Sequence, residues 1–137
     1  MSNQASAKGN VTDILLAKAD AKGKIGEIAL LKAGYVYEGQ AMTDAKCVGT
    51  FACPFDNTGG SDGLEIEINL GHEFTEFTFA NSAGGDAITQ ADVGNLCYVA
   101  GVSTVAKTNG SSTRSVCGKI WRLKSNGSVV VRISAIG

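Results

Sequence analysis

The chain lacks an excess of charge of either sign. Its 137 residues include 12 lysines and arginines and 13 aspartates and glutamates, which gives a formal net charge of −1. Proteins that bind nucleic acid usually present a basic face to the phosphate backbone, and the sequence contains no basic cluster of that kind. We therefore expect no nucleic acid among the partners of this protein.

Long hydrophobic runs are also missing. No apolar stretch approaches the roughly 20 residues that a membrane-spanning helix requires, so we expect no membrane association. The first residues, MSNQASAKGNVTD, do not have the basic-then-apolar layout of a secretion signal. These two features predict a protein that is made and initially kept in a cytoplasm.

Metal-binding residues are few and poorly spaced. His72 is the only histidine, and the cysteines Cys47, Cys53, Cys97 and Cys117 form no CxxC pair. Because zinc sites usually combine such a pair with further cysteines or histidines, we expect no metal. In a reducing cytosol the favoured interpretation is four buried free thiols, with disulfides formed after release as the alternative.

Few motifs of catalysis are present. The sequence has no GxxxxGK[ST] and no GxGxxG after a strand, and its GxSxG string, GGSDG at 59–63, lies in a polar loop and not between a strand and a helix. The segment 56–63, DNTGGSDG, lacks the alternating ligands of an EF-hand calcium loop. A group of acidic residues lies near His72, but outward glutamates on a strand are what solubility alone requires; its members are Glu65, Glu67, Glu73 and Glu76. We expect no enzyme and no cofactor.

Glycine, in contrast, is abundant. The chain has 18 glycines and a single proline, which is typical of a protein with many turns and bends. The fold class that we predict is all-β, with a single-domain antiparallel β-sandwich or barrel, jelly-roll-like, over residues 11–137. Residues 1–10 are small and polar without periodicity, which predicts a flexible N-terminal arm.

The clearest strand signal is LEIEINL, residues 64–70. Leucine and isoleucine alternate there with glutamate and asparagine, the period of a strand with one buried face. The segments 11–18 and 27–39 are also predicted strands. Residues 87–94 predict one helical turn, because Thr89 and Asp92 have the spacing of a capping box and Gly94 suits a left-handed exit. This turn would place NLCYVA back into a sheet, and an irregular connection is the alternative.

A hairpin is predicted near the C-terminus, because Asn126-Gly127 favours a two-residue type I′ turn. In that register Trp121 pairs with Arg132, which predicts a cation–π contact. Apolar side chains fall on both faces of this hairpin, so either a second layer or a second subunit must cover the face that water would otherwise wet. The subunit contact is favoured because Arg122 shares that face, and its candidate residues are Ile120, Arg122, Val129, Val131 and Ile133.

The segment Lys107–Arg114, KTNGSSTR, is polar for longer than a minimal turn requires. We interpret it as a protruding tip or as a loop that orders on a neighbouring molecule, and Arg114 is therefore a further interface candidate. A plain solvated loop is the alternative.

Five short motifs resemble small structural proteins of tailed bacteriophages that are encoded among the head genes. The matching residues lie in the C-terminal third; they are Ile88–Gly94, Tyr98-Val99, Thr104–Gly110, Thr113–Ile120 and Val129–Ile133. The pattern does not require Cys97, Cys117 or Trp121, and it marks turns and strands, not a reaction.

The resemblance implies a capsid decoration, or cement, protein. Such proteins are mostly β, commonly trimeric, and lie on the outer shell of the virion. For this chain it implies the major capsid protein and further copies of itself as partners. The alternatives from the sequence are another head–tail or tail component and a carbohydrate-binding β module, for which Trp121 and the tyrosines Tyr35, Tyr37 and Tyr98 are suggestive.

Overall fold

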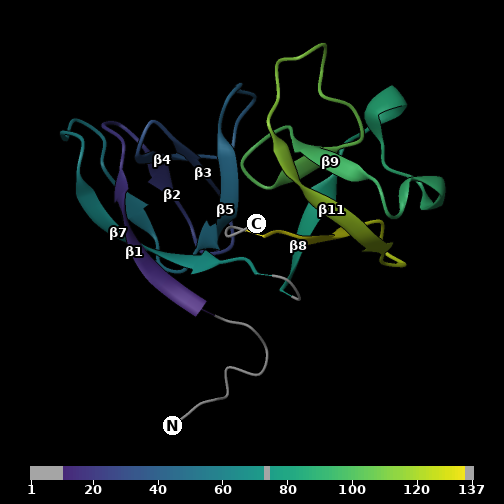
Figure 1. The fold of residues 1–137 in the computed structure, drawn as a ribbon, viewed down its shortest axis with the longest axis horizontal. Helices are drawn as coiled ribbons and strands as arrows, with labels where there is room; N and C mark the ends of the chain where they lie inside the picture. Colours follow the sequence, from purple (N-terminus) through teal and green to yellow (C-terminus); the bar gives the residue numbers. More distant parts are fainter. Residues whose placement is uncertain (1–10, 73–74, 135–137) are drawn as a thin grey trace, which may run out of the picture.

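A computed structural model describes residues 11–72 and 75–134. Almost all of its regular structure is strand, so the prediction of a single all-β domain is confirmed. The strands form two small closed barrels that lie side by side (Figure 1). We predicted either a β-sandwich or a barrel, and the two main sheets are barrels. The arm that we predicted at residues 1–10 lies outside the described residues.

The first barrel comes from the N-terminal half of the chain. Its sheet runs in the order β1-β4-β3-β5-β7, and β7 pairs again with β1 to close it. All its neighbouring strands are antiparallel except β1 and β4. A short ribbon of β2 and β6 accompanies it. The strands are β1 (Val11–Ala17), β2 (Lys22–Gly23), β3 (Ile28–Lys32), β4 (Tyr35–Glu38), β5 (Lys46–Phe51), β6 (Phe55–Asp56) and β7 (Leu64–Leu70).

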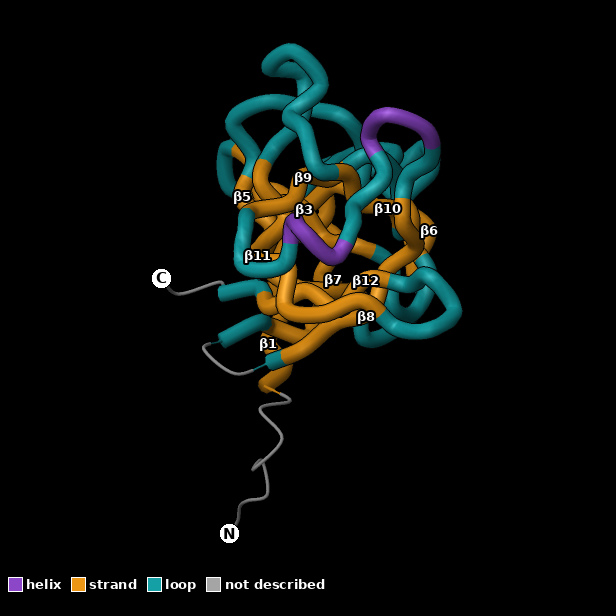
Figure 2. Tube along the Cα trace, turned by 90° about the vertical axis from the view of Figure 1, so that its right-hand side faces the viewer, coloured by secondary structure: helices purple, strands orange, loops and turns teal. Residues whose placement is uncertain are grey.

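The second barrel comes from the C-terminal half and runs in the order β10-β8-β12-β11-β9. Here β8 and β10 form the one parallel pair, and β9 pairs with β10 to close the sheet. Two short 3-10 helices, η2 (Gly84–Asp86) and η3 (Gln90–Asp92), connect β8 to β9, as the tube in Figure 2 shows. The strands are β8 (Glu76–Asn81), β9 (Leu96–Val99), β10 (Thr104–Ala106), β11 (Val116–Leu123) and β12 (Val129–Arg132).

Several local predictions are confirmed. The alternating segment 64–70 is strand β7, with Ile66 and Ile68 buried. The capped turn is η3, where the Asp92 carboxylate accepts from the backbone N–H of Thr89 at 2.7 Å. Gly94 follows it with φ of 97°, the left-handed conformation that glycine adopts at little cost. These features could be predicted because each depends on residues close in sequence.

The C-terminal hairpin differs from its predicted register. Its loop has three residues, because the N–H of Lys124 donates to Ser128 O and that of Gly127 donates to Lys124 O. Gly127 takes the left-handed position with φ of 91°, so a G1-type bulge replaces the type I′ turn. A second irregularity follows at Trp121, and the pairs become Lys119–Arg132, Ile120–Val131, Arg122–Val130 and Leu123–Val129.

Two apolar clusters form the core. The smaller lies inside the first barrel around Phe51 and Ile68. The larger joins second-barrel residues such as Ile120 and Val131 to Leu30 of β3 and Cys47 of β5. One wall of the first barrel therefore completes the core of the second, and the two barrels form one packed unit.

Polar and close backbone contacts fix the junction between the barrels. The Ser115 hydroxyl donates to Met42 O at 2.6 Å and accepts from the N–H of Ala45 at 3.1 Å. Gly71 lies very close to Ile133. A Cβ atom added at Gly71 would come within 2.0 Å of the carbonyl oxygen of Ile133. Since these contacts join segments far apart in sequence, sequence patterns gave no sign of them.

Candidate interaction surface

The outer face of the C-terminal hairpin carries a compact group of interacting side chains. The guanidinium of Arg132 lies over the ring of Trp121, 3.7 Å from its centroid, which confirms the predicted cation–π contact. Glu76 on β8 accepts from Arg122 Nη1 at 3.0 Å and from Arg132 Nη2 at 3.3 Å. Three neighbouring strands are thus linked on their solvent side.

The irregularity at Trp121 explains why this group faces water. In an uninterrupted strand Arg122 would point to the same side as Ile120. The register shift between these two residues places both Trp121 and Arg122 on the outer side, while Ile120 stays in the core. Trp121 keeps 42% of its surface exposed. The bulge therefore produces a surface that simple alternation does not predict.

The charges of this group favour the ionised form of Glu76. Its partial burial opposes ionisation, but the hydrogen bond from Arg132 and the charge and hydrogen bond of Arg122 outweigh that effect. They hold the pKa of Glu76 below its usual range. Both arginines are thereby held in position beside Trp121.

A cleft of about 400 Å³ lies next to this group, at the junction of the two barrels. Its charged lining residues are Lys46, Lys119 and Arg132, and none of its lining residues is acidic. Leu96 and Val116, which also line it, are 50% and 41% exposed. We call Leu96, Val116, Lys119, Trp121 and Arg132 the β9–β11 patch. An apolar surface with basic neighbours is suited to binding a partner with apolar and acidic groups.

Four of the predicted interface residues lie elsewhere. Ile120, Val129, Val131 and Ile133 are at most 1% exposed and belong to the larger core cluster. The prediction that they contact another subunit is wrong, because side chains without accessible surface are already covered. Of the two explanations for the two-faced hairpin, a second layer of the same chain is the one observed.

The two predicted interface arginines both have intramolecular partners. Arg122 is exposed and pairs with Glu76. Arg114 anchors the Lys107–Arg114 loop, which rises from the second barrel in Figure 1: its Nη1 donates to Asp86 Oδ2 at 3.3 Å and to Thr108 O at 3.1 Å. The hydroxyl of Thr108 also donates to Asp86, and these bonds lower the pKa of Asp86. The loop is thus tied to η2 at its base.

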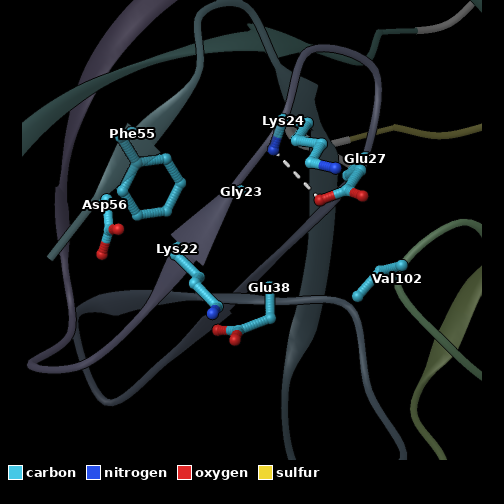
Figure 3. A pocket seen from close by; sticks show the side chains of 8 residues that line it. All are labelled: Lys22, Gly23, Lys24, Glu27, Glu38, Phe55, Asp56 and Val102. Carbon is cyan, nitrogen blue, oxygen red and sulfur yellow. Dashed lines mark hydrogen bonds between the residues drawn. The ribbon is translucent and has the colours of Figure 1, made fainter. Parts of the chain in front are cut away.

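A second pocket of about 400 Å³ lies beside the β2–β6 ribbon, and Figure 3 shows its side chains. It combines lysines and acids around Phe55 and Val102, and the N–H of Lys24 donates to Glu27 Oε1 at 3.0 Å. Its charges are of both signs, so it has no evident preference for one class of ligand. Its charged lining residues are Lys22, Lys24, Glu27, Glu38 and Asp56.

The acidic residues singled out in the sequence serve separate contacts. Glu67 accepts from the thiol of Cys53 at 3.3 Å, and Glu76 pairs with the two arginines. In the loop at 56–63, Asp62 accepts from the N–H of Ala19 at 2.8 Å and from Lys18 Nζ at 3.1 Å. Within residues 11–72 and 75–134 no group of three or more histidines, cysteines or acids is arranged to hold a metal ion. Glu73 lies outside the described residues.

The cysteines differ from the prediction in one respect. Cys47, Cys97 and Cys117 are buried, but Cys53 is exposed, so the prediction of four buried thiols is wrong for Cys53. All four are free. The three buried ones come from different strands, and sequence spacing gave no indication that they meet.

Comparisons with known proteins add no relative. No family model matches the chain, and neither a curated protein nor a solved structure matches it significantly. Among the described residues, no helix has the length and apolar character needed to cross a membrane. The functional interpretation therefore depends on the sequence motifs and on the surface described above.

Proposed function

We propose that this chain is a structural virion protein that binds the outside of a bacteriophage capsid and stabilises it, as a homotrimer. The major capsid protein is its main partner under this proposal. The observation that carries it is the head-protein resemblance, whose motifs all fall in one structural unit, the second barrel and its connections. The motif residues therefore build the same barrel, and that barrel carries the β9–β11 patch.

The motif residues occupy positions that shape the second barrel. Ile88–Gly94 includes the capped turn η3, and Val129–Ile133 includes β12 in the shared core. Thr113–Ile120 leads into β11, the strand that carries the β9–β11 patch. The motifs thus support the framework on which the patch lies, and the patch is the contact surface that we propose for the capsid.

Stabilisation would follow from linkage. A protein that binds only the mature shell lowers the free energy of that state, by about 2.7 kcal/mol per site at a hundredfold excess over its dissociation constant. A trimer that contacts several capsid subunits would gain further affinity through its effective concentration. The protein needs no chemical step for this role.

The role can be tested with capsids assembled without this chain. We expect added protein to bind them and to raise the temperature at which they release DNA. Trp121→Ala and Lys119→Glu should weaken binding, whereas Ile14→Ala on the first barrel, also an exposed apolar residue, should not. If capsids without the chain withstand heat as well as complete ones, the proposed role is wrong.

Two alternatives lead to different results. A head–tail or tail component would be found at one vertex and not over the shell. A carbohydrate-binding module would bind glycans in isolation; the stacked Arg132 already covers one face of Trp121, which leaves less of the ring for a sugar. A glycan array on the purified protein would separate this alternative from the capsid role.

A further inference from the structure

Three buried thiols meet at the junction of the two barrels. Cys47 lies on β5 of the first barrel, whereas Cys97 and Cys117 lie on β9 and β11 of the second. The Sγ atoms of Cys47 and Cys117 are 3.8 Å apart, although 70 residues separate them in the sequence. Cys97 is also a near neighbour of Cys117, since its thiol contributes to raising the pKa of Cys117. Cys117 therefore has two neighbours with which it could form a covalent bond.

The pair lies in the wall of a cleft. Cys47 and Cys117 are 4% and 3% exposed, and both line the cleft beside the β9–β11 patch. Cys97 is fully buried and is not among the residues that line this cleft. Lys46 and Lys119 line the same cleft. Cys47 and Cys117 are thus the members of the cluster that a reagent the size of hydrogen peroxide reaches first.

We propose that Cys47 and Cys117 form an oxidative modification site, in which hydrogen peroxide converts the two thiols into a disulfide that joins the barrels. One thiolate attacks a peroxide oxygen, the O–O bond breaks, and a sulfenic acid and one water form. The second sulfur then attacks the sulfenic sulfur, forming the S–S bond and releasing a second water. Two thiols are oxidised and one peroxide is reduced.

The geometry is close to that of the product. A disulfide requires its sulfurs about 2.05 Å apart, so these two sulfurs must approach each other by less than about 2 Å. The hydrogen bonds from Cys47 and Cys97, together with burial, raise the pKa of Cys117. The reaction is therefore faster at alkaline pH. Once the disulfide has formed, the Cys97 thiolate can attack the sulfur of Cys117 and release the Cys47 thiolate. A Cys97–Cys117 disulfide is therefore a minor product.

This site does not depend on the proposed capsid role. Its consequence is mechanical: a bond between β5 and β11 prevents the two barrels from separating. It also constrains the unfolded chain over 70 residues, so the oxidised protein should unfold at a higher temperature than the reduced one.

The test uses the full chain with Cys53→Ser, which removes the exposed thiol and intermolecular bonds through it. The folded protein is treated with hydrogen peroxide, blocked, digested without reductant and mapped by mass spectrometry. We expect a Cys47–Cys117 cross-linked peptide as the main product, and a higher melting temperature that returns to its original value with reductant. Cys97→Ala should keep the cross-link, and Cys47→Ala should lose it.

Three results would overturn the proposal. These are cysteines oxidised to sulfinic or sulfonic acids without a cross-link, a bond that forms only after unfolding in urea, and Cys97–Cys117 as the main product. If Cys47→Ala or Cys97→Ala does not fold, the peptide map of the Cys53→Ser protein alone decides, since it requires no change in the core.

Discussion

The two barrels have the same plan but different degrees of independence. Each has five strands, and each combines one parallel pair with antiparallel neighbours. The first encloses its own small core around Phe51. The second shares its core with Ile28, Leu30 and Cys47 of the first. A closed hydrogen-bonded sheet is therefore not by itself an independent folding unit; the side chains that it encloses decide that.

Their surfaces differ as well. On the first barrel the exposed Ile14 and Leu16 lie opposite Glu67 and Glu65 across the β1–β7 pair. On the second the exposed apolar residues adjoin Lys119 and the arginines. The first surface should thus attract basic partners and the second acidic ones. For this reason we place the capsid contact on the second barrel.

The largest expected effect tests the shared core. Ile120→Ala should lower the free energy of unfolding by about 2–5 kcal/mol, because it removes a fully buried side chain from the larger cluster. Its matched variant is Ile68→Ala in the first barrel, also fully buried. Both proteins should show one calorimetric transition. Two separate transitions, each shifted by only one variant, would mean that the barrels unfold independently.

A somewhat smaller loss is expected at the junction. Gly71→Ala places a methyl group against the carbonyl oxygen of Ile133 and should cost about 3 kcal/mol, since neither backbone can move far. Gly85→Ala, where a Cβ would meet open space, serves as the control. Chemical denaturation measures both. Equal stability of the two variants would contradict the close approach of the barrels.

Removal of one junction hydroxyl should have an intermediate effect. Ser115→Ala leaves the carbonyl of Met42 and the N–H of Ala45 without this partner in a part-buried place, at a cost of about 1–3 kcal/mol. Ser125→Ala, in the exposed hairpin loop, is the comparison. Urea unfolding curves should separate the two variants, and coincident midpoints would mean that the Ser115 contacts do not support the junction.

The smallest expected effect concerns how the stability of the protein falls at acidic pH. Because the folded pKa of Glu76 is lowered, its contribution is present above the usual carboxyl pKa and is lost as pH falls through the lowered value. Glu76→Gln should make the fall in stability with acid shallower, by less than about 1 kcal/mol, since the ion pairs are partly exposed. Asp13→Asn on β1 is the control, and thermal melts between neutral and acidic pH provide the measurement. An unchanged profile would show that the pairs add nothing.

Sequence patterns predicted the features that depend on near neighbours. These include strand β7, the capped turn η3 and the existence of the C-terminal hairpin. They failed at Trp121, where a bulge determined by the surrounding sheet reversed the side of Arg122. They also failed to distinguish a second layer from a second subunit over Ile120 and Val131, since both would cover the same apolar face. The shared core and the thiol cluster join residues that are far apart in the sequence. Neither composition nor local sequence patterns indicate such pairs.

The proposed decoration of a viral shell is tested most directly by a three-dimensional map of particles assembled with and without this protein. We expect additional density repeated over the whole outer surface of the complete particles, in groups of three, with the second barrel toward the shell. Density confined to a single vertex, or no difference between the two maps, would contradict it.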